Sequence, residues 1–208
     1  PPRKMLSKAK NIITSDLIKV SFLNGIAQVV RMLTGLVSVK VIAALIGPSG
    51  IALLGQLNNF STILLSLSNG GINAGITKYV SENQENESEY SGYIGTGFWI
   101  TTLLSFAISF TLIFGAGYFS RSILMSEEYR RVFYIFGATI IFYSLSALLI
   151  AVLNGFKEYR KYVIINISGS IIGLIFSIIL AFRFGSFGAL VAAVTFQSVV
   201  FIVILALL

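Results

Sequence analysis

The sequence predicts an all-α membrane protein with six transmembrane helices. Three observations predict this class: 56% of the 208 residues are hydrophobic, only 11% are charged, and the mean hydropathy is +0.89. Such a composition is typical of a chain whose solvent is largely lipid. Because an α-helix needs about 20 apolar residues to cross a hydrocarbon core, runs of that length mark the candidate spans.

Six apolar runs follow one another along the chain, and the connections between them differ. The turns GPSG (47–50) and GSFG (185–188) are short and rich in breakers, so they allow only helical hairpins. Residues 81–91 form a polar loop, 120–131 a short interfacial piece, and 155–161 a basic loop. After an N-terminal segment (1–16), the predicted spans are 17–46, 51–80, 93–119, 132–154, 162–184 and 188–208.

The placement of Lys and Arg predicts a cytoplasmic N-terminus, because cytoplasmic loops of membrane proteins are enriched in both. With that orientation, nine basic residues fall on the inner side and four on the outer side. The inner set is Arg3, Lys4, Lys8, Lys10, Lys19, Lys78, Lys157, Arg160 and Lys161; the outer set is Arg121, Arg130, Arg131 and Arg183. The chain begins Pro1-Pro2 and ends within the apolar run VVFIVILALL, so we expect it to be one half of a longer protein.

The composition also excludes several function classes. The sequence has no His and no Cys, which removes zinc and iron–sulfur sites, a Cys nucleophile, a Ser–His–Asp triad and a disulfide framework. No cofactor and no metal are predicted. The net charge of +7 indicates membrane topology, anionic lipid head groups or an anionic substrate rather than nucleic acid.

Within the first span, Arg31 near the middle and Lys40 further out are costly in lipid unless they face a polar cavity or a partner. Arg31 belongs to a stripe that recurs every three or four residues, which places it on one side of a helix. This stripe is Asn24, Gln28, Arg31, Gly35 and Ser38. Lys40 lies on the opposite side near the outer end, where its stem could snorkel. The stripe predicts either a polar seam facing a cavity or hydrogen bonds between helices.

The second span repeats this pattern more densely. Its polar stripe comprises Gln56, Asn59, Thr62, Ser66, Asn69, Asn73 and Thr77. Within the stripe, Gly70, Gly71 and Gly75 predict a weakened or bent helix that could act as a hinge and line a cavity. The alternative is a loop boundary, with the span ending at Asn69.

The later spans give weaker signals. The fifth carries a stripe of mostly small residues, which favours close helix packing over ligand contact. These residues are Asn166, Gly169 or Ser170, Gly173 and Ser177. A shift of 138 residues also aligns Gly35 with Gly173 and Gly47 with Gly185. The alignment indicates either an internal repeat, as in many transporters, or the shared need of membrane hairpins for glycine at the turn.

No Asp or Glu lies inside a predicted span, and Asp16 is the acid closest to the Arg31 stripe. Carriers coupled to protons or sodium usually keep a carboxylate in the core. Three explanations stay open: the acid lies in the missing half, Asp16 fills the role, or another driving force operates.

Two stretches carry a resemblance to a known family. They are VRMLTGLVSVKVIAALIGPSGIALLGQLNNF (30–60) and SNGGINAGITKYVSE (68–82). The order of a basic residue, GL, Lys, GPxG and GGxxxGxTKYV resembles the Wzx-type O-antigen and enterobacterial-common-antigen flippases. These belong to the multidrug/oligosaccharidyl-lipid/polysaccharide exporter superfamily. The fourth to sixth spans are similar only at the level of the class.

The resemblance implies a multi-pass protein of the bacterial inner membrane with two six-helix lobes, of which this chain would be the N-terminal one. It implies the flipping of undecaprenyl-diphosphate-linked oligosaccharide from the cytoplasmic to the periplasmic leaflet by alternating access. The implied partners are that lipid-linked oligosaccharide, membrane lipids, the C-terminal lobe, and the polysaccharide polymerase and chain-length machinery.

A diphosphate in a membrane cavity needs cations, and sugar hydroxyls need a wall of amides. The predicted diphosphate ligands are Arg31, Lys40 and Lys78. The predicted polar wall is Asn24, Gln28, Gln56, Asn59, Asn69 and Asn73, with a hinge at Gly70, Gly71 and Gly75.

Two other functions fit the same sequence. A multidrug exporter of the same superfamily is disfavoured by Arg31 and by the lack of a carboxylate within the spans. A non-transporting membrane subunit would use the polar stripes as assembly contacts. A membrane glycosyltransferase fits least, because its outer loops would offer only Glu127 and Glu128.

Overall fold

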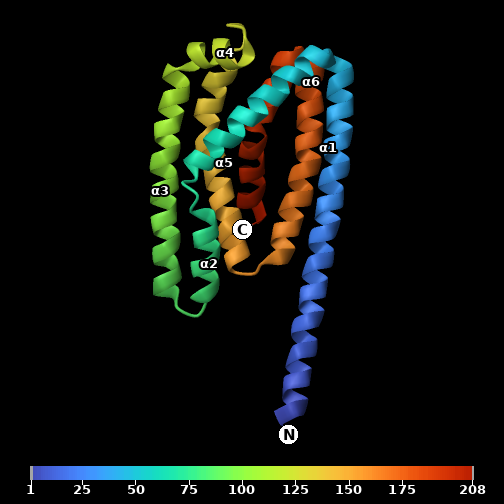
Figure 1. Ribbon diagram of the computed structural model, residues 1–208, viewed down its shortest axis with the longest axis vertical. Coiled ribbons are helices and arrows are strands. Elements are labelled where there is room, and N and C mark those ends of the chain that lie inside the picture. The colour runs from blue at the N-terminus through green and yellow to red at the C-terminus, as the bar shows by residue number, and fades with distance from the viewer. Residues whose placement is uncertain (1, 208) are drawn as a thin grey trace.

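The computed structural model describes the backbone of residues 2–207 and the side chains of residues 22, 24–196 and 198–206. The predicted N-terminal segment (1–16) and Asp16 therefore lie outside the residues whose side chains are described. Throughout the described backbone the regular structure is helical (Figure 1). The helices are α1 (Pro2–Ser68), α2 (Asn73–Glu82), α3 (Glu87–Phe114), α4 (Ala116–Leu124), α5 (Arg130–Gly155) and α6 (Tyr159–Leu207).

The two longest helices, α1 and α6, each reverse direction at a glycine (Figure 1). Gly47 has φ +71° and Gly185 has φ +57°, a conformation that glycine adopts at little cost and other residues rarely do. Each helix therefore has a first limb (24–46 in α1, 159–184 in α6) and a second limb (48–68 and 186–207). The two glycines aligned by the 138-residue shift thus form equivalent turns, which agrees with both explanations of that alignment.

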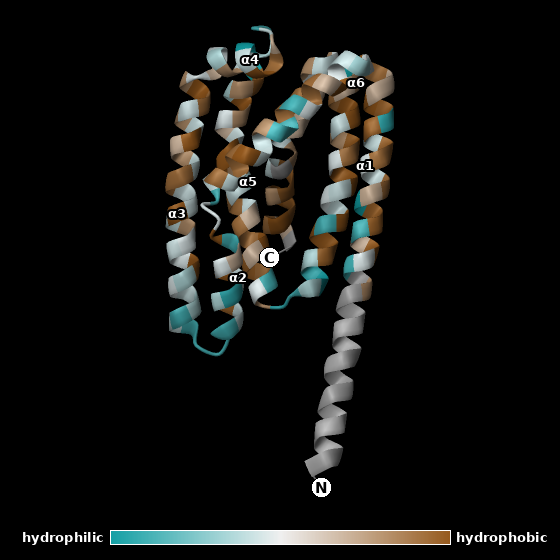
Figure 2. Ribbon diagram, in the orientation of Figure 1, coloured by the Kyte–Doolittle hydropathy of each residue, from teal (hydrophilic) through white to brown (hydrophobic). Residues whose placement is uncertain are grey.

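Within the described residues, four helical segments are long and apolar enough to cross a membrane. Hydrophilic residues gather at the α2–α3 and α5–α6 connections (Figure 2). The predicted class, an all-α membrane protein, is confirmed. Six separate crossings, one for each limb of α1 and α6, remain a prediction. The four segments are Asn24–Ser68, Glu87–Phe114, Arg130–Gly155 and Tyr159–Phe196.

The structure corrects two predicted boundaries. The predicted loop over 81–91 is helical at both ends, because α2 runs to Glu82 and α3 already begins at Glu87. Glu87 and Glu89 lie in the first turn of α3, where carboxylates interact favourably with the helix dipole. The predicted 93–119 span ends at Phe114, and the chain bends at Gly115 into α4. A criterion based on apolar length misses both features.

The predicted second span (51–80) is interrupted. α1 ends at Ser68, and α2 begins at Asn73 after a turn in which Gly70 and Gly71 have φ +56° and +67°. Gly75 lies within α2. The glycine-rich stretch therefore does break the helix, while its action as a hinge stays a prediction.

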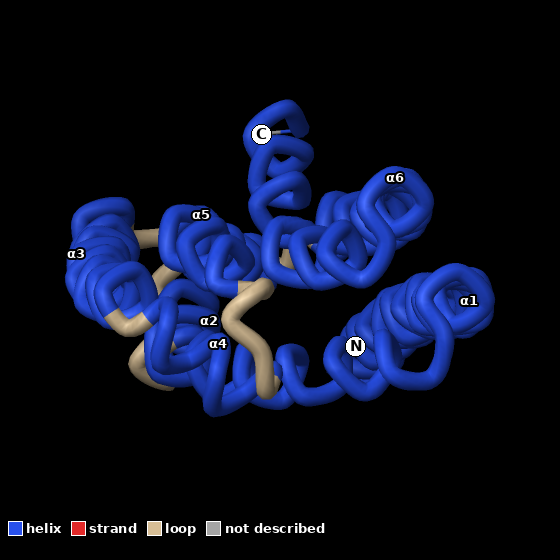
Figure 3. Tube along the Cα trace, turned by 90° about the horizontal axis from the view of Figure 1, so that it is seen from above, coloured by secondary structure: helices blue, strands red, loops and turns tan. Residues whose placement is uncertain are grey.

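The main apolar core joins α3, α4 and α5 to the second limbs of α1 and α6. Phe133 and Phe136 of α5 are its largest buried side chains, and Leu57 of α1 and Leu190 of α6 pack into the same cluster. Seen from above, α3, α5 and the first limb of α6 lie in a row, with α1 and α2 on one side of it (Figure 3). The core thus holds the second limbs in place.

Candidate functional site

A cavity of about 500 Å³ lies between the limbs of α1 and α6. Its volume falls within the roughly 300–1,000 Å³ of typical ligand pockets. All four limbs contribute to its wall, together with Ile150 of α5. Its polar and glycine lining residues are Arg31, Thr34, Gly35, Ser38, Gly55, Asn58, Asn166, Gly169, Ser170, Gly173 and Ser177.

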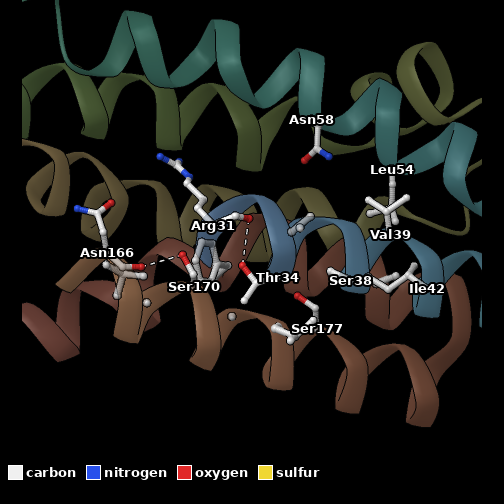
Figure 4. A pocket seen from close by; sticks show the side chains of 18 of the residues that line it. Arg31, Thr34, Ser38, Val39, Ile42, Leu54, Asn58, Asn166, Ser170 and Ser177 are labelled. Carbon is white, nitrogen blue, oxygen red and sulfur yellow. Dashed lines mark hydrogen bonds between the residues drawn. The ribbon is translucent and has the colours of Figure 1, made fainter. Parts of the chain in front are cut away.

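Arg31 is the charged residue among those that line the cavity within the described part of the chain. Its side chain extends from the first limb of α1 into the space between the limbs, toward which Asn58 points from the second limb (Figure 4). The ion pair found among the described residues joins Arg121 to Glu127 and does not involve Arg31. A guanidinium presents five N–H donors in a planar fork, so an anion is the ligand that Arg31 suits best.

Several polar groups in the wall already have partners. Thr34 Oγ1 donates to the carbonyl of Val30 at 2.9 Å, and Ser170 Oγ donates to that of Asn166 at 2.7 Å. The Asn166 side-chain amide donates to the carbonyl of Tyr162 at 2.8 Å. These bonds fix the wall, while the amide of Asn58 and the hydroxyls of Ser38 and Ser177 form no hydrogen bond to other described residues. They are the wall groups best able to meet a ligand.

Glycines shape the cavity in two ways. A Cβ added to Gly35 or Gly55 would meet no atom within 4 Å, so at these positions the backbone borders open space. A Cβ on Gly173 would instead overlap the ring of Phe196, and one on Gly169 would lie 3.2 Å from Val200 Cγ2. The glycines of α1 therefore leave room, whereas those of α6 let its two limbs pack closely.

The structure does not bring the predicted site residues together. Of the predicted diphosphate ligands, Arg31 lines the cavity and Lys40 is exposed outside it. Lys78 is exposed on α2, with Nζ 5.6 Å from the centre of the Tyr79 ring. The predicted wall residues Asn24 and Gln28 are exposed outside the cavity as well. Their roles as ligands stay predictions.

In the second limb of α1, the predicted stripe is one position out of phase with the cavity. Gln56 and Asn59 are exposed outside it, while Asn58 lines it together with Ile51, Leu54 and Gly55. Ile51, Leu54, Gly55 and Asn58 are related by spacings of three and four residues, which is the pattern of one helix face. The pattern is visible in the sequence only if Gly55 is counted as part of the face. The predicted stripe ran through Gln56 and Asn59 and therefore missed Asn58.

Asn69 and Asn73 lie at the break between α1 and α2, outside the cavity. Their side-chain oxygens are buried and have no hydrogen-bond partner among the described residues. The hinge glycines Gly70 and Gly71 lie between them. This group therefore belongs to a different part of the fold from Arg31.

The stripe in the first limb of α6 was predicted to serve packing, and its glycines do so. Its polar members Asn166, Ser170 and Ser177 also line the cavity, which the sequence interpretation missed. The 138-residue shift offered a usable signal, because the aligned glycines Gly35 and Gly173 both line the same cavity.

A family model described as polysaccharide biosynthesis protein matches residues 17–208 of the chain. The lipid III flippase of Escherichia coli (strain K12) is 24% identical to the chain over 188 residues, and that of Shigella flexneri is equally similar. The alignment covers 90% of this chain and 45% of each relative. The chain thus spans about half the length of the curated relatives that it matches, and no solved structure matches it significantly.

Proposed function

The chain belongs to the polysaccharide biosynthesis protein family, and from this premise we propose that it flips undecaprenyl-diphosphate-linked oligosaccharide from the cytoplasmic to the periplasmic leaflet. Membership confirms the predicted resemblance to Wzx-type polysaccharide flippases. The chain is a multi-pass membrane protein. We propose that it acts as a transporter and catalyses no chemical step.

The observation that carries this proposal is Arg31 on the wall of a cavity between apolar helices. A cation at the centre of a membrane helix costs about 2.5–3.5 kcal/mol on insertion scales. A cavity of about 500 Å³ offsets this cost, because it admits water or an anionic ligand to the guanidinium. The diphosphate is the anionic part of the proposed substrate, and its oxygens accept the paired hydrogen bonds that Arg donates.

The remaining wall supports a sugar as the neighbouring part of the substrate. Asn58, Ser38 and Ser177 offer amide and hydroxyl groups that both donate and accept hydrogen bonds. Each such bond contributes only about 0.5–1.5 kcal/mol, so selectivity for a sugar comes from several acting together. The lipid tail would remain in the bilayer beside the lobe.

The finer features of this proposal follow from the family resemblance. We propose six crossings, a cytoplasmic N-terminus, location in the bacterial inner membrane and a second lobe that closes the cavity. Alternating access would then follow if the substrate binds the inward-facing and outward-facing states with different affinity. O-antigen and enterobacterial common antigen are the proposed substrate classes, with Lys40 and Lys78 as further contacts outside the described cavity.

Complementation tests the proposal directly. The full-length gene is expressed in a bacterium that lacks its own flippase, and export of lipid-linked O-antigen or common antigen is scored. We expect rescue by the wild type and loss of at least roughly tenfold in export for Arg31→Ala, because one charge-assisted contact contributes about 1.5–3 kcal/mol. Arg183→Ala is the matched control, since Arg183 is an exposed arginine of α6 outside the cavity lining.

Full export by Arg31→Ala, with the protein present in the membrane at wild-type levels, would remove Arg31 from the substrate site. Resistance to cationic drugs gained in the same strain would favour the multidrug exporter instead. An unchanged phenotype in both assays would favour the non-transporting subunit.

A further inference from the structure

A second group of polar side chains lies on the break between α1 and α2 and on the segments of α3 and α5 at the same level, away from the cavity. Ser68 Oγ lies 2.7 Å from Ser144 Oγ of α5, which ties the end of α1 to the middle of α5. A Cβ on Gly70 would lie 2.9 Å from Leu104 Cδ1 and 3.8 Å from Ile100 Cγ2, which places the break against the same level of α3. The group, here called the buried polar layer, comprises Ser68, Asn69, Asn73, Thr101, Thr102, Ser105 and Ser144.

Five oxygens of the buried polar layer have no hydrogen-bond partner among the described residues. They are Asn69 Oδ1, Asn73 Oδ1, Thr101 Oγ1, Thr102 Oγ1 and Ser105 Oγ. Thr101 and Ser105, one helical turn apart on α3, are each 0% exposed. Buried polar atoms are nearly always paired, so unpaired oxygens on helix segments at the same level indicate a ligand that the layer is built to hold.

The backbone at the break adds further acceptors. Its hydrogen bonds end on the carbonyls of Leu65, Leu67, Asn69 and Ile72. Within the described residues, none of these bonds uses the carbonyls of Ser68, Gly70 or Gly71. These carbonyls lie at the C-terminal end of α1, which carries the negative end of the helix dipole.

The chemistry of the layer selects the class of ligand. The unpaired groups are oxygens, and broken membrane helices bind sodium through unwound carbonyls and helix C-terminal ends. No carboxylate belongs to the layer, whereas calcium and magnesium sites in proteins rely on carboxylates. None of the seven side chains titrates near neutral pH, which excludes a proton as the bound ion.

We propose that the buried polar layer binds a sodium ion, with Thr101, Ser105 and Asn73 among its ligands. This site is separate from the cavity and does not depend on which substrate the protein carries. It also provides a monovalent cation site in a chain whose predicted spans lack a carboxylate. Binding would join α1, α2 and α3 at the break and so favour one arrangement of Gly70 and Gly71.

Thermal unfolding of the purified full-length protein in detergent tests the proposal without any substrate. A ligand that binds only the folded state raises Tm as its concentration passes Kd. We expect Tm to rise with NaCl and to stay constant with equimolar N-methyl-D-glucamine chloride. Thr101→Val keeps the side-chain shape and removes one ligand, so we expect Na⁺ affinity, measured with ²²Na⁺, to fall by roughly tenfold or more.

Ser109→Ala is the matched control. Ser109 lies on the same face of α3, one turn beyond Ser105, but its Oγ donates to the carbonyl of Gly137 at 2.7 Å. We expect this variant to keep the wild-type response to Na⁺. In Na⁺-free buffer Thr101→Val should be at least as stable as the wild type, because it removes an unpaired buried hydroxyl.

Three results would overturn the proposal: equal Tm in the two salts, an equal response to K⁺ and Na⁺, or unchanged Na⁺ affinity in Thr101→Val. Ser105→Ala provides the same test if Thr101→Val fails to fold. Because the readout is ion binding alone, a negative result would leave the proposed transport function intact. Conversely, failed complementation together with Na⁺ binding would count against the proposed transport function and leave the sodium site intact.

Discussion

The cavity and the buried polar layer contain similar side chains but have opposite properties. The cavity has about 500 Å³ of space and the guanidinium of Arg31. The buried polar layer has no charged member, and its hydroxyls at Thr101 and Ser105 are fully buried. One region therefore offers donors to an anion, whereas the other offers oxygens to a cation.

The difference teaches that polarity within a membrane helix does not by itself identify a binding surface. The ligand that each region can hold depends on the space available and on whether its polar groups are donors, which suit an anion, or oxygen acceptors, which suit a cation. Both regions depend on glycine, but in different conformations. Gly35 borders open space within a helix, whereas Gly70 and Gly71 form a turn with positive φ.

Filling the cavity should have the largest effect. In Gly35→Leu the new side chain would project into the cavity, where even a Cβ meets no atom within 4 Å. We expect export in the complementation assay to fall to background while Tm stays within a few degrees of wild type. We expect the fold to survive, because the first added carbon meets no existing side chain and the rest of leucine enters the open space of the cavity.

Gly25→Leu controls for the added bulk. Gly25 lies on the same limb of α1 with nothing within 4 Å of its Cβ position, but it does not line the cavity. Export should be retained. If Gly25→Leu lost as much export as Gly35→Leu, added bulk would be harmful anywhere on this limb. The distinction between cavity and surface positions would then fail.

A smaller effect is expected where glycine serves packing. In Gly173→Ala the added Cβ would overlap the ring of Phe196 across the two limbs of α6. Overpacking of this kind typically destabilises by about 1–3 kcal/mol, which denaturant unfolding in detergent would measure. Gly35→Ala should be neutral or stabilising by up to about 1 kcal/mol, because Ala favours helix over Gly. If Gly35→Ala were less stable than Gly173→Ala, the assignment of Gly35 to open space and of Gly173 to helix packing would be contradicted.

Composition and periodicity predicted much of the fold. The apolar runs identified the membrane class, and the breaker-rich turns at Gly47 and Gly185 were recognised because only glycine adopts positive φ readily. At Gly70 and Gly71 a weakened or bent helix was expected, because glycine-rich stretches interrupt membrane helices, with a loop boundary after Asn69 as the alternative. The start of α3 at Glu87 was missed, since a polar first turn carries no apolar signal.

The site was predicted less completely. Arg31 was identified because an isolated cation within an apolar run is costly and needs a reason. Asn58 and Ser177 were missed because the face that a helix turns toward a cavity depends on its neighbours. A single sequence shows which residues share a helix face. Which face of α1 lines the cavity depends on where the two limbs of α6 lie, and this is visible only in the structure.

The most direct test of the central claim is binding of a lipid diphosphate to the purified full-length protein. Undecaprenyl diphosphate would be titrated into the wild type, Arg31→Gln, Lys40→Gln and Arg183→Gln at equal ionic strength. We expect Arg31→Gln to raise Kd by roughly tenfold or more, since it removes a charge-assisted contact. We expect a smaller increase for Lys40→Gln, because Lys40 is a proposed further contact outside the cavity, and none for Arg183→Gln, because Arg183 lies outside the cavity and has no proposed contact. Equal Kd for the wild type and Arg31→Gln would contradict the claim that this cavity holds the diphosphate.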